Sequence, residues 1–186
     1  MKLIEYPDKN KWADILKRPV IETSSLNEKV KAILDEIKAK GDKAISRFSL
    51  EFDKVELDNF VVSEDEIKEG LSLIDNSLKE AIEKAAENIF KFHKSQSFES
   101  RIIETQPGVK CWQKSVAIEK VGLYIPGGTA PLFSTVLMLA IPANIAGCKE
   151  IILCTPPQKD GKIHPAILFS AHLAGVTNIF KIGGIQ

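Results

Sequence analysis

Two glycine pairs, each directly after an apolar segment, are the residues whose type and spacing could hold a ligand. Segment 124–128 reads YIPGG, and segment 181–186 reads KIGGIQ. Glycine lets a backbone approach an anion closely enough for its amide N–H groups to donate hydrogen bonds. A helix that begins after such a turn adds the positive end of its dipole. The chemistry indicated is the binding of a phosphate or a nucleotide.

The glycine pattern leaves two interpretations open. It does not match G-x-G-x-x-G, and no ribose-binding acid is recognisable after the apolar segment 151–154. The glycines therefore form either structural turns or a cradle for a nucleotide, and the residues alone do not choose between them.

Other kinds of site chemistry find no support in the residue pattern. None of the three histidines has partners at metal-ligand spacing, and Ser134 and Thr135 lack a G-x-S-x-G setting. The three cysteines are odd in number and have no C-x-x-C spacing, so we expect small, partly buried free thiols. We predict no catalytic residue and no metal ligand within this chain.

The elements that must position the glycine pairs alternate between strand and helix. Apolar segments 121–125, 151–154 and 178–182 indicate strands, and segments 130–141 and 165–174 indicate helices, the first stopped by Pro142. The order β-α-β-α-β predicts a parallel sheet with right-handed crossovers, as in half of a Rossmann-like fold. Because the carboxyl ends of parallel strands meet at one edge, both glycine pairs should face one crevice.

Residues 1–120 form a different, mainly helical region. The capping-box patterns at Ser25 and Ser63 start two amphipathic stretches, and Gly41 is placed to end the first. A short helix is expected over 42–51, and Asp75 could start a fresh helix inside the second stretch. Segments 102–105 and 109–116 flank Gln-Pro-Gly and predict a β-hairpin. The fold class is α/β, with a helical first part at 1–120 and a Rossmann-like half at 121–186.

Charge and composition exclude several classes of function. Lys plus Arg and Asp plus Glu both number 25, with a sequence pI near 6.8, so no positive field favours nucleic acid or a membrane surface. Segment 121–148 has no charged side chain, but its prolines and glycines argue for burial rather than a membrane span. The charged first ten residues do not resemble a signal peptide, and we expect a cytoplasmic protein.

The sheet predicted for residues 121–186 is incomplete. The sequence stops directly after the third strand, where a doubly wound domain would continue. We expect the N-terminal part of a longer protein, or a small domain whose sheet edge is covered by something else. A truncated chain should also expose apolar surface and self-associate.

Four segments carry a resemblance to a known family. The segments are KAKGDKAISRFSLEFDK at 38–54, VGLYIPGGTAPLFSTVLMLAIPANIAGCKEIILCTPP from 121, GKIHPAILFSAHLAGV from 161, and IFKIGGIQ at the end. Together they resemble histidinol dehydrogenase. The resemblance implies a zinc-dependent, NAD-using oxidoreductase that converts L-histidinol through the aldehyde to L-histidine, in histidine biosynthesis. It also implies a homodimer with incomplete Rossmann-like domains.

The resemblance assigns cofactor contacts but no catalytic group to this chain. NAD-contacting positions of the family match Tyr124 and Gln186, with Gly127 and Gly128 beside them. The zinc ligands, the proton-transfer pair and the substrate-contacting residues of the family come from parts absent here, so we expect this portion alone to be inactive. The alternative is a non-catalytic α/β module that binds a phosphorylated ligand or a partner chain.

Overall fold

Three parallel strands form the larger of two sheets, and this larger one is called the sheet below. The computed structural model describes residues 3–18, 24–128 and 130–186. The strands lie in the order β3 (Lys120–Tyr124), β4 (Glu150–Thr155) and β5 (Asn178–Lys181). The α/β class and the β-α-β-α-β order predicted from the sequence are confirmed.

The register brings the carboxyl ends of all three strands to one edge. Tyr124 pairs with Cys154, and Thr155 pairs with Lys181. The ladder continues one step beyond β3, because the N–H of Ile125 donates to the carbonyl of Cys154. The turns that carry the two glycine pairs therefore leave the sheet at the same edge.

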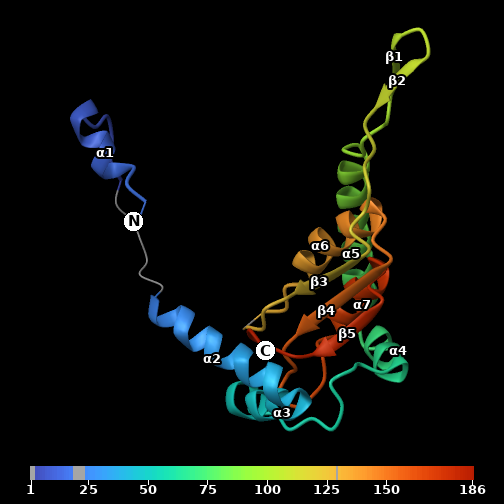
Figure 1. Cartoon of the computed structure of the whole chain (residues 1–186). Helices are drawn as coiled ribbons and strands as arrows, with labels where there is room; N and C mark the ends of the chain where they lie inside the picture. The colour runs from blue at the N-terminus through green and yellow to red at the C-terminus, as the bar shows by residue number, and fades with distance from the viewer. Residues whose placement is uncertain (1–2, 19–23, 129) are drawn as a thin grey trace.

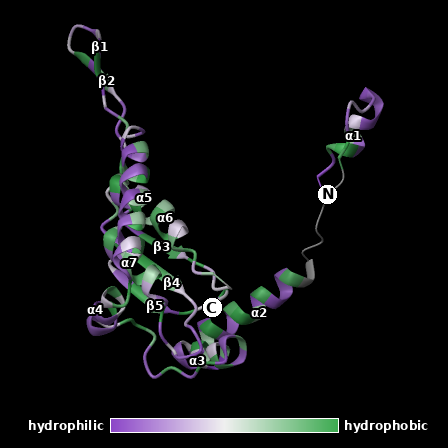
Figure 2. Ribbon diagram, turned by 180° about the vertical axis from the view of Figure 1, so that it is seen from behind, coloured by the Kyte–Doolittle hydropathy of each residue, from purple (hydrophilic) through white to green (hydrophobic). Residues whose placement is uncertain are grey.

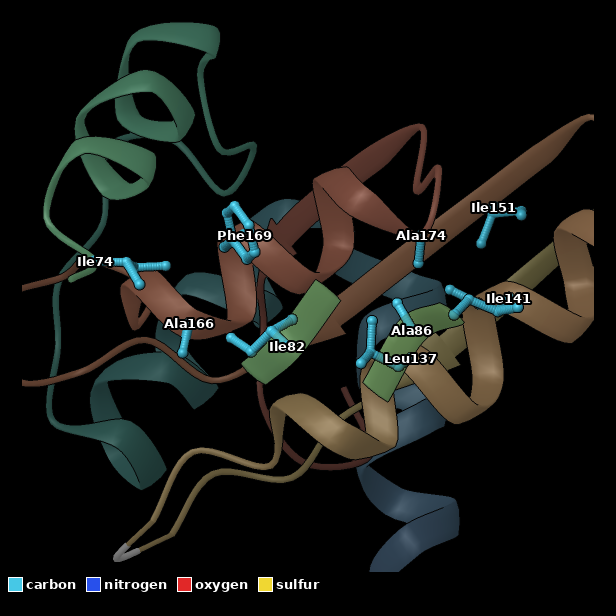
Figure 3. Packing of buried hydrophobic residues seen from close by; sticks show 10 residues of the cluster. Ile74, Ile82, Ala86, Leu137, Ile141, Ile151, Ala166, Phe169 and Ala174 are labelled. Carbon is cyan, nitrogen blue, oxygen red and sulfur yellow. The ribbon is translucent and has the colours of Figure 1, made fainter. Parts of the chain in front are cut away.

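Helices α6 (Phe133–Ala146) and α7 (Pro165–Leu173) supply most of the core against one face of the sheet. Val121 and Leu123 turn toward these helices, so strand alternation turns Gly122 and Tyr124 to the opposite face. Helix α5 (Asn76–Lys94) packs on the far side of α6 and completes the core. Figure 3 shows side chains of α5, α6 and α7 meeting in this cluster.

Helix α6 corrects one prediction from the sequence. Pro142 does not end it, and the helix continues to Ala146. Proline loses one backbone hydrogen bond inside a helix, but Ile141 is buried and Ile145 packs against the same core. The helix instead ends at Gly147, whose φ of 89° suits the left-handed cap. Tertiary packing therefore outweighs the local preference of proline.

The helices that cover the outside of the core begin at predicted caps. Ser63 forms a complete capping box with Glu66 at the start of α4 (Glu64–Ser72). The side chain of Asp75 accepts from the N–H of Leu78 at 3.0 Å, so α5 is a fresh helix. Both caps agree with the sequence patterns.

The N-terminal helices are joined by a left-handed glycine. Helix α2 (Ser24–Lys40) ends before Gly41, which has a φ of 56° and precedes α3 (Asp42–Phe48). Helix α2 already includes Ser25, and the side chains at its first turn lie outside the described residues, so the predicted capping box at Ser25 stays a prediction. After α3 the chain forms a π-helical turn, η2 (Ser49–Asp53), where the sequence predicted a simple helix over 42–51.

Two segments lie away from the core. The hairpin strands β1 (Ile102–Gln106) and β2 (Val109–Trp112) are exposed along their whole length, and β2 is shorter than predicted. The 3-10 turn η1 (Lys9–Lys11) and α1 (Trp12–Ile15) have no buried residue. Figure 1 shows both segments set apart from the sheet, and Figure 2 shows hydrophobic and hydrophilic residues alternating along α2.

Within residues 3–18, 24–128 and 130–186, no helix is both long enough and apolar enough to cross a membrane. The core takes side chains from both sides of residue 120, because Ile82 of α5 and Leu137 of α6 lie in one cluster. The division into parts at residue 120 stays a prediction.

Candidate functional site

A hydrogen bond joins the two glycine-rich turns at the carboxyl edge of the sheet. The backbone N–H of Gly184 donates to the Tyr124 hydroxyl at 3.0 Å, between residues 60 positions apart. Tyr124 remains 43% exposed, so part of this residue is open to solvent. The sequence predicted that these turns face one crevice, and the structure places Tyr124 and Gly184 together.

Pro156 explains one glycine of each pair. A Cβ atom at Gly127 would lie 2.5 Å from Cγ of Pro156, and a Cβ atom at Gly183 would lie 2.7 Å from Cβ of Pro156. Both distances are shorter than any contact that a real Cβ atom makes, so a residue larger than glycine would clash with Pro156 at either position. Gly127 and Gly183 are therefore packing glycines that let the turn after β4 fit between its neighbours.

The second glycine of each pair has a different environment. A Cβ atom at Gly128 would meet nothing within 4 Å, so no packing contact requires glycine there. Gly184 adopts a φ of 66°, which favours glycine, and the Gln186 side chain folds back over it. Gly128 is the position in the first turn where a ligand could approach the backbone.

A cavity of about 360 Å³ opens beside the first turn, on the helix side of the sheet. Its wall includes Gly127, Gly128, Thr155 and His164. Helix α6 begins at this cavity without a side-chain cap. His164 caps α7, because its Nδ1 accepts from the N–H of Ala166 at 3.1 Å. Tyr124 and Gln186 do not line the cavity, so the predicted cofactor residues divide between two neighbouring surfaces.

Gln186 presents an amide with no partner. Its side-chain Oε1 and Nε2 atoms are both buried and make no hydrogen bond with the described residues. An amide can both donate and accept. These two atoms lack partners but are out of contact with solvent, so a polar ligand could bond to them only after the Gln186 side chain turns outward.

Asp53 is a residue at this edge that the sequence did not point to. The η2 turn carries its carboxylate to Gly183, where a Cβ atom would lie 3.0 Å from Oδ1 and 3.1 Å from Oδ2. Burial raises the pKa of the Asp53 carboxyl above its ordinary value. Only the fold brings residue 53 to the end of β5, and no spacing in the sequence could have indicated this.

Thiol and metal-ligand chemistry have little support among the described side chains. Cys154 on β4 is the register partner of Tyr124 and is half-buried, and burial raises the pKa of its thiol, which makes the reactive thiolate harder to form. Among the residues with assigned positions, no three His, Cys, Asp or Glu side chains lie together as metal ligands would. The arrangement can bind and orient a ligand through its backbone, hydroxyl, amide and carboxylate groups.

Comparison with known proteins decides the family. The family model for histidinol dehydrogenase matches residues 16–186. The chain belongs to the histidinol dehydrogenase family.

Relatives and a solved structure agree with this assignment. The histidinol dehydrogenase of Bacteroides thetaiotaomicron is 59% identical over 186 residues, which is 100% of this chain and 44% of that protein. The histidinol dehydrogenase of Escherichia coli is 47% identical over 173 residues, covering 92% of this chain and 39% of that protein. A crystal structure of histidinol dehydrogenase from Elizabethkingia anophelis matches with a TM-score of 0.91 and 49% identity, over 97% of this chain and 42% of that one.

The family resemblance read from segments 38–54 and 121–186 is therefore confirmed. The chain spans 44% of the length of the Bacteroides thetaiotaomicron histidinol dehydrogenase. The cofactor contacts of Tyr124, Gly127, Gly128 and Gln186 stay predictions.

Proposed function

We propose that this chain supplies the NAD-positioning part of a histidinol dehydrogenase that oxidises L-histidinol through the aldehyde to L-histidine. The NAD-binding site, called the seat below, would lie at the carboxyl edge of the sheet, between the turn after β3 and the turn after β5. The hydrogen bond from Gly184 to Tyr124 is the observation that carries the proposal. It holds both turns at one edge, where ligands of open α/β sheets bind.

The side chains at this edge fit the groups of a dinucleotide. Tyr124 offers a partly exposed aromatic side chain, and Gln186 has an amide whose buried atoms lack partners among the described residues. Gly128 leaves its backbone accessible beside the uncapped start of α6, where a phosphate would be favoured. When bound, NAD would accept hydride from the alcohol carbon. The role of this chain would be to hold and orient the cofactor.

We propose that zinc chemistry depends on residues outside this chain. The described part holds no group of three possible ligands, which supports this proposal. We propose that the zinc ligands and the proton-transfer groups lie in the part of the longer family members that this chain does not cover. Residues 1–186 alone should then give no NADH from zinc, NAD and histidinol, and turnover by this chain alone would contradict the proposal.

Calorimetric titration with NAD tests the seat directly. We expect Tyr124→Ala to weaken NAD binding about tenfold or more, the scale of a lost aromatic contact and its associated hydrogen bond. Gln186→Ala should weaken it by a similar factor. NAD binding that both variants leave unchanged would remove the proposed seat.

Matched controls separate the seat from general effects of substitution. Tyr6 is 99% exposed and far from the sheet, so Tyr6→Ala should leave NAD binding unchanged. Gln113→Ala, on the exposed chain after the hairpin, is the control for Gln186→Ala. Loss of affinity in these controls would show that the assay reports folding rather than contact.

We also propose that the protein functions as a homodimer. The hairpin exposes Ile102, Ile103 and Trp112, and α2 exposes Leu26 and Leu34. Such apolar surface is typical of an interface between chains. Sedimentation velocity should show a dimer that the double variant Ile102→Ser with Trp112→Ser weakens, and a monomer at every concentration would contradict this proposal.

The parts of the chain would then divide the work. Residues 121–186 would hold the cofactor, and residues 1–120 would supply the helices that cover the core and the surfaces that meet the second copy. This division at residue 120 is a proposal that rests on the cofactor seat and the exposed apolar segments.

A further inference from the structure

Asp53 occupies an unusual place for an acidic side chain. It ends the π-helical turn η2 and lies against Gly183, directly beyond β5. Figure 1 shows α3, which precedes this turn, at the end of the sheet toward which the arrowheads of β4 and β5 point. Turns of the π type are rare and frequently lie at functional sites.

The carboxylate of Asp53 has no partner to compensate its burial. Its Oδ2 atom is buried and accepts no hydrogen bond within the described part of the chain. The neighbouring cation does not serve it, because Lys54 Nζ donates to the Glu51 carbonyl at 2.7 Å. Arg47, the next cation along the chain, binds Glu36 and Glu51.

A buried acceptor without a donor destabilises a folded protein. The pKa of Asp53 is raised for the same reason, since desolvation disfavours the charged form. A side chain with a purely structural role would gain stability from a hydrogen bond or an ion pair. Among the described residues Asp53 has neither, and its Oδ1 atom, unlike Oδ2, is not buried, so a ligand that reaches Oδ1 could bring the donor.

The position of Asp53 indicates which kind of ligand group would donate a hydrogen bond to its carboxylate. In dinucleotide-binding sheets, an acid near the strand ends accepts hydrogen bonds from a ribose hydroxyl. The sequence shows no such acid after β4, where the usual pattern would place it. Asp53 reaches the same edge from the helical region, beside the turn whose Gly184 bonds to Tyr124.

We propose that Asp53 is the ribose-binding acid of this fold, accepting hydrogen bonds from the adenosine ribose hydroxyls of NAD. This inference rests on the proposed NAD seat. It adds a residue from the helical region to a site otherwise built from the turns after the strands.

Asp53→Asn tests the inference by calorimetry and thermal unfolding, with NAD as the probe. We expect NAD to bind about tenfold more weakly to Asp53→Asn, as for the loss of a hydrogen bond to a charged acceptor. Without NAD, the unfolding midpoint should rise, because the uncompensated charge is gone. Asp58→Asn, a matched change at an exposed carboxylate nearby, should alter neither quantity. Asp53→Ala repeats both measurements if Asp53→Asn does not fold.

NAD lacking the adenosine 2′-hydroxyl identifies the group that Asp53 contacts. In the unsubstituted protein, this analogue should bind more weakly than NAD. In Asp53→Asn, the analogue and NAD should bind equally well. An equal penalty in both proteins would overturn the ribose contact. A midpoint that falls together with the affinity would show a structural carboxylate and would also overturn it.

The outcomes separate this inference from the proposal on which it rests. If NAD binds and its affinity is lowered by Tyr124→Ala but not by Asp53→Asn, the proposed seat is supported and the proposed role of Asp53 is wrong. If the unsubstituted protein does not bind NAD, both are wrong.

Discussion

Helices α5 and α2 are both long and amphipathic, but they bury their apolar faces to different extents. In α5, Ile82 is 1% exposed and lies in the core with α6 and α7. In α2, Leu34 is 45% exposed, and no side chain described for that helix is fully buried. The same periodic pattern therefore serves two purposes in one chain.

The difference teaches which interactions hold the fold and which await a partner. Most of the buried area lies in α4 to α7 and the sheet, so the free energy of folding should be concentrated there. The hairpin exposes its apolar residues, and α2 leaves Leu26 and Leu34 exposed while Val30, Ile33 and Ile37 are only half-buried, which favours association with another surface. Substitutions in the two regions should have correspondingly different effects.

The largest expected effect comes from a cavity in the core. Leu137 is fully buried in α6, so Leu137→Ala should lower the free energy of unfolding by about 3 kcal/mol. Ile103→Ala in the exposed hairpin should change it by less than about 0.5 kcal/mol. Urea denaturation measures both, and equal losses would contradict the contrast between the two regions.

A somewhat smaller effect is expected at the ion pair that fastens α4 to β5. Burial alone would raise the pKa of Glu66, but hydrogen bonds from Ser63 and Lys181 outweigh it and lower that pKa. Lys181 Nζ lies 2.9 Å from Glu66 Oε1 and is 9% exposed. Glu66→Gln leaves that cation buried without its partner, and the loss should be about 2 kcal/mol after allowing for the partial exposure of Glu66.

The pH dependence of this pair has a definite sign. Because the folded pKa of Glu66 is lowered, its contribution is complete above the ordinary glutamate value and disappears as the pH falls through the folded pKa. The penalty of Glu66→Gln, followed by denaturation at several pH values, should shrink on acidification. Glu87→Gln, which removes an exposed pair with Lys84, is the control and should cost little at any pH. A penalty for Glu66→Gln that grows toward acid pH would refute this account.

The smallest of these effects distinguishes the two glycines of the first turn. Gly127→Ala would force its Cβ against Pro156 and should cost about 1–2 kcal/mol of stability. Gly128→Ala meets open space, so it should leave stability unchanged and weaken NAD binding. Thermal unfolding and NAD titration of both variants check this, and a stable Gly127→Ala would show that Pro156 can move aside.

Much of the fold could be predicted from local patterns. Ser63, Asp75 and Gly41 act through neighbouring backbone groups, so their roles are visible in a few residues of sequence. The strands and their parallel order follow from apolar runs separated by helices. Pro142 was misread because the packing of the residues around it, which only the fold supplies, decides where α6 ends.

The candidate site was predictable only in part. Tyr124 and the terminal glycines follow strands, and strand ends converge at one edge, so their proximity could be foreseen. Asp53 reaches that edge through the packing of a distant turn, and Pro156 gives Gly127 and Gly183 a packing reason that no motif reveals. Residues that act through the tertiary fold escape sequence patterns for this reason.

Nuclear magnetic resonance of the backbone amides during NAD titration tests the shared seat most directly. We predict that the amide signals of Gly128, Gly184 and Asp53 shift together and give one dissociation constant. The account would be contradicted if these three signals did not shift while other amide signals showed saturation with NAD. It would also be contradicted if the three signals gave different dissociation constants, because a single seat at this edge of the sheet requires one.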